Sequence, residues 1–515
     1  MDELLIDGNS LTINDVISVA YSPSRQVRLT EGSISRIIKA SDAVAEFVRQ
    51  GKIVYGITTG FGAFKDKIIP TDQVELLQNN ILLSHAVGVG PALDIATTRA
   101  MLLIRANTLA KGHSGIRIDT LNLLLDMLNK GIYPVIPEKG SLGASGDLAP
   151  LAHMALPLIG MGEVIYQNVR MSSTEAFSRV GLKPIRLMAK EGLALTNGTS
   201  FMTALGAISC WKAMNLVKAA DLSAALTLEA LNGTSRAFDA RIHELRQHEG
   251  QKICASNLIN LLEESTFVRD DDPHNVQDAY TLRCIPQVHG AVRDTLFHCL
   301  RIIETELNSV TDNPLIFFDD LGNPEIISGG NFHGEPLAFA MDFLGIAMTD
   351  LGNMMERRIA KLVDDTNNQH ELPAFLTKNG GVNSGFMLLQ YTAAALASEN
   401  KVLSHPSSTD SIPSSANVED HVSMGANSAL HARDILANIE MILSLELLSA
   451  AQAVDFRKSE NLSLRLGKGT RILYELIRQH VPFVERDTLM YPLIHSMHAL
   501  LTSEKFVTLV NNLVD

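Results

Sequence analysis

The chain has 515 residues, of which 46% are hydrophobic and 19% are charged, and its 43 basic against 57 acidic side chains give a net charge of −14. This composition is too apolar for an intrinsically disordered chain and suffices for a large hydrophobic core. The negative charge argues against nucleic acid or an acidic membrane surface as the main partner.

Helical periodicity is the first local signal. Apolar residues recur at helical spacing from Ser33 to about Gln50, and Gly51 ends this run. The segment Ile53–Tyr55 then predicts a short strand that leads into a glycine-rich turn at 60–62. Two more helices are expected around Asp72–His85 and Asp94–Ala110.

Two β-hairpins are expected among these helices. One spans Gly162–Met171. The other pairs Leu315–Phe318 with Glu325–Ser328 around the turn 320–323, where Asp, Gly and Asn are typical turn residues.

The C-terminal half has the pattern of long helices. Pro336 stands where a helix would begin, and no proline follows up to Val363. The segment Gly385–Lys401 is apolar on nearly every face, so we expect other helices to bury it on all sides. A third long helix is expected over Ala429–Ala453. Such helices bury well against copies of themselves, so a homo-oligomer is expected.

These elements predict a mainly α protein with two domains. A loop-richer N-terminal domain is expected over residues 1–200, and a long helical bundle with a C-terminal helical region over 201–515.

Cysteine usage and the N-terminus bear on the compartment. The four cysteines are far apart and form no CxxC pair, which favours neither a zinc site nor a disulfide scaffold. The N-terminus is acidic where a signal peptide is basic, and no run of about 18 uncharged apolar residues occurs. We expect a cytoplasmic protein with no membrane partner and no metal.

The most informative segment is Ala144-Ser145-Gly146, within the glycine-rich stretch 140–150. A phosphate-binding loop is disfavoured, because no Lys follows the glycines. The unhindered backbone nitrogen of Gly146 could instead attack the Ala144 carbonyl carbon. Loss of water from that ring and from the Ser145 side chain would leave an exocyclic methylidene, which is a strong electrophile.

The segment GSLGASGDLAPLAHM resembles the signature of the aromatic amino acid ammonia-lyases, which build a 4-methylidene-imidazole-5-one (MIO) group autocatalytically. The resemblance covers nearly the whole chain. Five further blocks stand in family order, at 55–62, 197–199, 277–284, 328–333 and 417–424. The resemblance implies a mainly α-helical homotetramer that needs no external cofactor, with active sites that draw on three subunits.

The family resemblance assigns catalytic roles to the electrophile and to two tyrosines. An electrophile made from residues 144–146 would capture the substrate nitrogen and improve it as a leaving group. Tyr55 matches the tyrosine usually assigned as the base for the β-proton, although a phenol needs help to ionise at neutral pH. Tyr280 matches a second tyrosine near the electrophile, in a proton relay.

Four further matches concern the substrate. Arg283 offers a planar fork that suits a carboxylate. The resemblance assigns the amides of Asn197 and Gln277 to the substrate carboxylate and the imidazolone oxygen. Phe332 resembles a pocket residue beside the substrate ring.

His85 and Glu419 bear on the choice of amino acid. Histidine-directed family members carry Glu where Glu419 stands, whereas phenylalanine- and tyrosine-directed members typically carry Gln. A carboxylate can accept an imidazole N–H, and a phenyl ring offers it nothing. His85 matches a ring-facing position. These residues favour L-histidine, converted to trans-urocanate.

Three positions depart from the histidine-directed pattern. Thr58, Thr196 and Val418 stand where such members usually have Asn, Leu and Gln. A ring-modified histidine or another aromatic amino acid therefore remains an alternative substrate. A tyrosine or phenylalanine ammonia-lyase and a 2,3-aminomutase remain alternative functions, because the same electrophile serves them.

Overall fold

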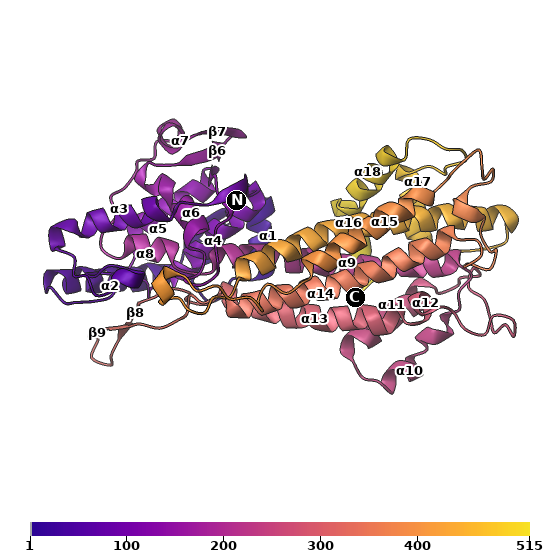
Figure 1. The fold of residues 1–515 in the computed structure, drawn as a ribbon, viewed down its shortest axis with the longest axis horizontal. Coiled ribbons are helices and arrows are strands. Elements are labelled where there is room, and N and C mark those ends of the chain that lie inside the picture. The colour runs from indigo at the N-terminus through magenta and orange to yellow at the C-terminus, as the bar shows by residue number, and fades with distance from the viewer. Residues whose placement is uncertain (1–2) are drawn as a thin grey trace. The chain divides into compact units, whose positions relative to one another are not determined.

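The computed structural model describes residues 3–515. It is mainly α-helical with a few short strands, as predicted (Figure 1). The residues form two compact units. Unit 1 contains the residues up to Trp211, Leu300–Asp342 and Pro406–Leu430, and unit 2 contains Lys212–Cys299, Phe343–His405 and His431–Asp515.

Unit 1 combines short helices with small sheets. Its α-helices are α1 (Ile13–Tyr21), α2 (Glu31–Arg49), α3 (Val74–His85), α4 (Ile95–Ala110), α5 (Ile118–Asn129), α6 (Leu148–Ala155), α7 (Ser173–Val180) and α8 (Glu191–Thr196). Its 3₁₀ turns are η1 (Gly62–Phe64), η2 (Thr71–Gln73), η3 (Leu156–Ile159) and η6 (Ser415–Asn417).

The strands of unit 1 form four small sheets among the described residues. The strands are β1 (Glu3–Ile6), β2 (Gln26–Leu29), β3 (Val89–Ala92), β4 (Ile132–Pro134), β5 (Pro137–Lys139), β6 (Glu163–Tyr166), β7 (Val169–Ser172), β8 (Leu315–Phe318) and β9 (Pro324–Ile327). β1 and β2 pair in parallel, β3 pairs with β5, β4-β6-β7 form an antiparallel sheet, and β8 and β9 form a hairpin.

Four long helices contribute residues to both units: α9 (Ser200–Ala230), α13 (Ile285–Leu307), α14 (Glu335–Val363) and α16 (Gly425–Glu460). The elements confined to unit 2 are η4 (Ser235–Phe238), α10 (Ala240–Glu244), α11 (Glu249–Leu261), α12 (Tyr280–Arg283), η5 (Ala374–Leu376), α15 (Met387–Leu403), α17 (Lys468–His480), α18 (Met490–Leu501) and α19 (Glu504–Leu513).

The predicted helices and hairpins are confirmed, and their ends have local causes. The helix expected from Ser33 is α2, which begins after Thr30, whose side chain accepts a hydrogen bond from the Ser33 N–H. The helix expected from Asp94 is α4, for which the Asp94 carboxylate caps the Thr97 N–H. Both hairpins form, and the long helices α14 and α16 cover their predicted ranges.

The strand predicted at Ile53–Tyr55 is wrong. The chain turns there instead, because the Val54 carbonyl accepts hydrogen bonds from the N–H groups of Ile57 and Thr58. A short β-prone segment becomes a strand only beside a partner strand. Tyr55 therefore lies in a turn.

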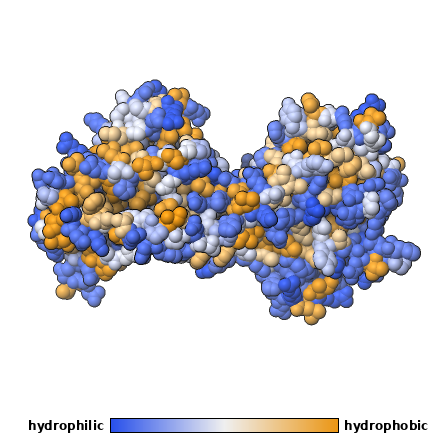
Figure 2. Space-filling model, in the orientation of Figure 1, coloured by the Kyte–Doolittle hydropathy of each residue, from blue (hydrophilic) through white to orange (hydrophobic). Residues whose placement is uncertain are grey.

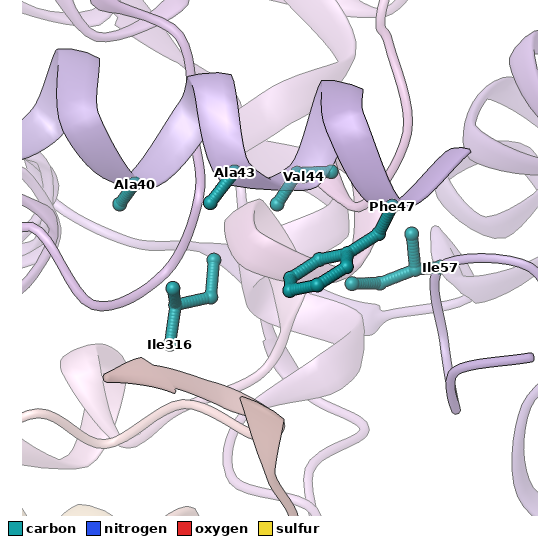
Figure 3. Packing of buried hydrophobic residues seen from close by; sticks show 6 residues of the cluster. All are labelled: Ala40, Ala43, Val44, Phe47, Ile57 and Ile316. Atoms are coloured by element: carbon teal, nitrogen blue, oxygen red, sulfur yellow. The ribbon is translucent and has the colours of Figure 1, made fainter. Parts of the chain in front are cut away.

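A hydrophobic cluster anchors this turn. Ala40, Ala43, Val44 and Phe47 of α2 pack with Ile57 and with Ile316 of β8 (Figure 3). All are buried, and Ile57 and Ile316 are fully so. Because Ile57 lies two residues after Tyr55, this packing fixes the position of the turn that carries Tyr55.

The helices of unit 2 are joined by polar contacts as well as by apolar packing (Figure 1). Arg358 of α14 donates to both carboxylate oxygens of Glu446 on α16, and Thr227 of α9 donates to the same carboxylate. All three side chains are fully buried. These contacts fix α9, α14 and α16 side by side.

The expectation that α15 is buried on all sides is wrong for the single chain. Only Leu389, Ala393 and Asn400 of this helix are buried. Leu388, Tyr391 and Val402 are exposed by 57%, 59% and 73%. Hydrophobic residues also reach the surface elsewhere in the molecule (Figure 2). The other helices of the chain cover one side of α15 and leave its remaining apolar faces open.

Within residues 3–515, every helix is too short or too polar to cross a membrane.

Candidate active site

Unit 1 contains a cavity of about 1120 Å³ into which several of the predicted residues project. The polar side chains that line it are those of Tyr55, Lys67, Asn80, Ser84, His85, Ser145, Asn197, Ser414, Ser415 and Glu419. Apolar residues such as Leu77, Ile81 and Leu193 complete its wall. This is the size and character of a cavity for a small organic molecule.

The tripeptide 144–146 is held in a tight loop at this cavity. Gly146 has φ +69°, and a Cβ added there would lie 2.2 Å from the Gly198 carbonyl oxygen. The next residue, Asp147, donates its N–H to that same oxygen at 2.7 Å. Only glycine therefore fits at position 146, for both conformational and steric reasons.

Asp147 anchors the loop to the first turn of α9. Its carboxylate accepts the N–H groups of Phe201 and Met202 and the Ser141 hydroxyl. Burial raises the pKa of Asp147 to about 7, although the hydrogen bonds from Met202, Ser141 and Phe201 lower it. The residue thus holds the C-terminal side of the loop from within the core.

The side chains of the tripeptide point in different directions. Ala144 is buried against Val422 and Met424. Ser145 lines the cavity, and its hydroxyl donates to Glu419 Oε1 at 2.7 Å. The residue that would become the methylidene therefore faces the open space. A backbone reversal at a glycine, with a serine toward the cavity, fits the formation of an MIO group.

Glu419 is held by a second serine. The Ser414 hydroxyl donates to Glu419 Oε2 at 2.9 Å. The backbones of the two residues also pair, with the Ser414 N–H to the Glu419 carbonyl at 2.9 Å and the reverse bond at 3.3 Å. Between them, Ser415, Ala416 and Asn417 all have positive φ.

His85 is the last residue of α3 and shares the cavity with Glu419. Burial lowers the pKa of His85, and the Ile81 carbonyl and the negative charge of Glu419 act in the opposite direction. The Ser84 hydroxyl lies 3.0 Å from His85 Nδ1. The imidazole ring of His85 and the carboxyl group of Glu419 thus line the same cavity.

Tyr55 and Asn197 complete the predicted residues in this cavity. The Gly62 N–H donates to the Tyr55 hydroxyl oxygen at 3.4 Å. Asn197 is 4% exposed, and its Oδ1 atom has no hydrogen-bond partner among the described residues. Because a buried amide oxygen without a partner is costly, this atom is a ready acceptor for a ligand.

The structure places the other four predicted residues elsewhere. Phe332 belongs to unit 1 but is not among the described residues that line the cavity. Gln277, Tyr280 and Arg283 belong to unit 2. There the Arg283 guanidinium lies 4.9 Å from the centre of the Tyr280 ring and donates to the Asp278 carbonyl, while Tyr280 is 71% exposed.

One group of side chains in unit 2 has the residue types of a metal site. Asp221, Cys254 and His289 are buried together. Burial by itself would raise the pKa of Asp221, but the charge of Arg293 and the hydrogen bond from His289 outweigh it and leave the pKa below its usual range. Arg293 also contacts the Asp221 carboxylate, so these residues form a buried ion-pair network.

Sequence reasoning did not identify Ser414 as a site residue. Its role depends on a turn that brings its hydroxyl back to Glu419, and no residue pattern marks such a turn. The only available signal was its position five residues before Glu419.

Comparison with known proteins gives one consistent family. The model of the family described as aromatic amino acid lyase matches residues 11–479. The chain is 60% identical over 506 residues to a histidine ammonia-lyase of Chloroflexus aurantiacus, covering 98% of this chain and 97% of that protein.

Two solved structures show the same fold over the whole chain. One is a histidine ammonia-lyase from Trypanosoma cruzi, with a TM-score of 0.91 and 40% identity, covering 100% of this chain and 96% of that one. The other is a tyrosine aminomutase from Streptomyces globisporus, with a TM-score of 0.93 and 38% identity, covering 100% and 99%.

Proposed function

The chain belongs to the aromatic amino acid lyase family, whose members carry an MIO group, and we propose that it converts L-histidine to trans-urocanate and ammonia. The observation that carries this proposal is the Glu419 carboxylate, which lies in the cavity in hydrogen-bond contact with Ser145. The 60% identity to a protein named histidine ammonia-lyase supports it.

We propose that Ala144, Ser145 and Gly146 form the MIO group autocatalytically, with no external cofactor. The positive φ of Gly146 and the orientation of Ser145 toward the cavity support this assignment. Once formed, the group supplies an electrophile that captures the substrate amine and makes it a better leaving group. Asp147 and Gly198 hold the loop in place for this role.

Glu419 is assigned to the ring of the substrate. A carboxylate accepts the N–H of an imidazole and stabilises positive charge on that ring. His85 lines the same cavity and offers a second polar contact for the ring. A phenyl ring would leave Oε1 of this carboxylate desolvated without a partner, at a cost of about 1–3 kcal/mol or more. This difference is the basis for histidine as the substrate.

Tyr55 is assigned as the base that removes the β-proton, and Tyr280 as a member of the proton relay. The Gly62 N–H donates to the Tyr55 hydroxyl oxygen and supports the position of that oxygen at the cavity. The turn that carries Tyr55 is fixed by the packing of Ile57.

The remaining predicted residues are assigned to the rest of the substrate. Arg283 binds the carboxylate as a two-point fork, with the amides of Asn197 and Gln277 as further partners. The unpartnered Oδ1 of Asn197 supports a role for its amide. Phe332 is assigned to the pocket beside the ring.

We propose a homotetramer in which active sites draw on three subunits. The exposed apolar residues of α15 support association of copies. Tyr280 is exposed in the single chain, which leaves it accessible to another copy. The four cysteines form no disulfide bond within the described residues, which fits the reducing cytoplasm that we propose as its location.

The test is the product formed from three amino acids. Purified protein is incubated separately with L-histidine, L-tyrosine and L-phenylalanine, and ultraviolet spectra are recorded. We expect urocanate from histidine, at a higher rate than coumarate or cinnamate from the other two. No urocanate, with coumarate or cinnamate formed instead, would contradict the proposal.

A second candidate is a 2,3-aminomutase that acts on an aromatic amino acid. The match to the tyrosine aminomutase favours it as the alternative, and the departures at Thr58, Thr196 and Val418 leave room for an aromatic amino acid other than histidine. It is distinguished by the same incubations, since an aminomutase would accumulate the β-amino acid rather than release ammonia.

A further inference from the structure

The two oxygens of the Glu419 carboxylate are held by hydroxyl groups with different fates. Oε1 accepts from Ser145, at 2.7 Å, and Oε2 accepts from Ser414, at 2.9 Å. In the proposed function Ser145 loses its hydroxyl when the electrophile forms, whereas Ser414 keeps its own. Formation of the electrophile therefore frees Oε1 and leaves Oε2 occupied.

Ser414 is held firmly enough to orient a carboxylate. Its backbone pairs with that of Glu419 in both directions, so the two residues close the turn 414–419. Ser415, Ala416 and Asn417 all adopt a left-handed conformation, which reverses the chain between Ser414 and Glu419. A Cβ added at Gly62 would lie 2.7 Å from the Ser415 hydroxyl oxygen. The segment after Tyr55 that contains Gly62 therefore packs closely on the turn 414–419.

A carboxylate without this second contact would be poorly oriented. The terminal torsion of a glutamate side chain has a broad, two-fold preference. A hydrogen bond to Oε2 restricts that torsion and leaves Oε1, which lies toward residue 145 and the cavity, as the oxygen without a hydrogen-bond partner once the Ser145 hydroxyl is lost. The ring of a substrate then meets one acceptor at one position.

We propose that Ser414 is a positioning residue that determines ring specificity, because it holds Glu419 Oε2 so that only Oε1, freed when Ser145 loses its hydroxyl, accepts the substrate ring N–H. This inference rests on the proposed function and assigns a device for its selectivity. Ser414 acts on the ring only through Glu419.

The test is a double-mutant cycle on histidine turnover. Ser414→Ala is made in the parent enzyme and in a Glu419→Ala background, and kcat/KM is measured for each. We expect a loss of about tenfold in the parent, the size typical of a hydrogen bond to a charged group. In the Glu419→Ala background the loss should be less than about twofold, since nothing remains for Ser414 to orient.

Ser411→Ala is the matched control for loosening of the same segment. The Ser411 hydroxyl accepts the Val422 N–H at 3.1 Å and has no hydrogen bond with the Glu419 carboxylate. Its effect should be the same in both backgrounds. An equal loss from Ser414→Ala in both backgrounds, or no loss in the parent, would overturn the inference.

A pair of β-branched variants provides a second test of the inference if Ser414→Ala disturbs folding. Ser414 has an extended backbone, φ −133° and ψ −179°, which suits both Thr and Val. Ser414→Thr keeps the hydroxyl and should retain the parental kcat/KM within about twofold, whereas Ser414→Val should lose about tenfold. Equal activities of the two variants would overturn the inference.

Two further readouts separate this inference from the proposed function. The intact mass of each variant shows whether the electrophile has formed, and we expect the same loss of two water molecules in Ser414→Ala as in the parent. If the parent makes no urocanate, both the proposed function and the inference about Ser414 are wrong. If the parent makes urocanate and the cycle is additive, only the inference fails.

Discussion

Ser145 supplies the carbon of the proposed methylidene, and its neighbours cannot replace it. Ala144 has a Cβ but no leaving group, and Gly146 has no Cβ at all. Ser145→Ala should therefore lower histidine turnover by at least about a thousandfold, as expected when a covalent catalytic group is removed. Ammonia release is the measurement. Ser35→Ala, at an exposed position of α2, is the control and should keep parental activity.

A near-parental rate in Ser145→Ala would remove the electrophile from the mechanism. The intact mass of the same variant should not fall by two water molecules, because an alanine side chain has no hydroxyl group to lose as water and no methylidene can form.

Glu419 provides the test of ring recognition. Glu419→Gln keeps the shape of the side chain but removes its charge, so histidine should lose about tenfold to hundredfold in kcat/KM. Phenylalanine, which offers the carboxylate no N–H, should lose less or gain. The measurement is kcat/KM for each substrate in parent and variant. Equal losses with both substrates would contradict the assignment of Glu419 to the imidazole.

Individual site residues were predictable only where a residue with suitable side-chain chemistry stands within a short sequence motif. Ser145, Tyr55, Asn197, His85 and Glu419 were predicted from short motifs, and all five line the cavity in unit 1. Their roles stay predictions. Ser414 was not predictable, because its contact with Glu419 depends on the left-handed turn between them.

At the scale of elements, Asp147 couples the tripeptide loop to α9. Its pKa is raised to about 7 in the folded chain, from an ordinary value of 3.8. An acid with a raised folded pKa stabilises the fold below its unfolded pKa, and that stability is lost as the pH rises through its folded pKa. The affected window is therefore about pH 4 to 7.

Asp147→Asn should remove this pH dependence. Between pH 5 and pH 7 the parent should lose stability relative to the variant, by on the order of 1 kcal/mol per pH unit. The measurement is the melting temperature of both proteins across that range. Asp319→Asn is the control, since Asp319 is exposed and its pKa lies below its usual value. Parallel curves for parent and Asp147→Asn would contradict the prediction.

The elements themselves followed from the sequence where local signals suffice. α2 and α4 have both helical periodicity and a capping side chain, and the hairpin β8–β9 has turn residues between its strands. The segment Ile53–Tyr55 has β-prone residues but no partner strand, and so it forms a turn. Pairing partners are a tertiary property that local composition does not specify.

At the scale of the whole molecule, the exposed apolar residues of α15 are relevant to how copies of the chain associate. Its sequence is apolar on nearly every face, yet the single chain buries only Leu389, Ala393 and Asn400 of it. Complete burial was predicted because an all-round apolar helix needs cover. The sequence does not say whether that cover comes from the same chain or from another copy, and the proposed homotetramer supplies it from other copies.

The double variant Leu388→Glu, Tyr391→Glu should weaken the assembly, because two charges would have to be buried at an apolar contact. Analytical ultracentrifugation should show a tetramer for the parent and smaller species for the variant. The rate of histidine turnover, measured separately, should fall in the variant. Leu321→Glu is the control, since this exposed residue lies in the turn of the β8–β9 hairpin. An intact tetramer in the double variant would argue that α15 does not lie at the interface.

Formation of the MIO group is tested most simply by the intact mass of the purified, catalytically active protein, followed by mass spectrometry of the peptide that contains residues 144–146. We expect a mass below that of the encoded chain by two water molecules, with the whole difference in that peptide. An active preparation in which residues 144–146 keep their full encoded mass would show that turnover does not need the MIO group.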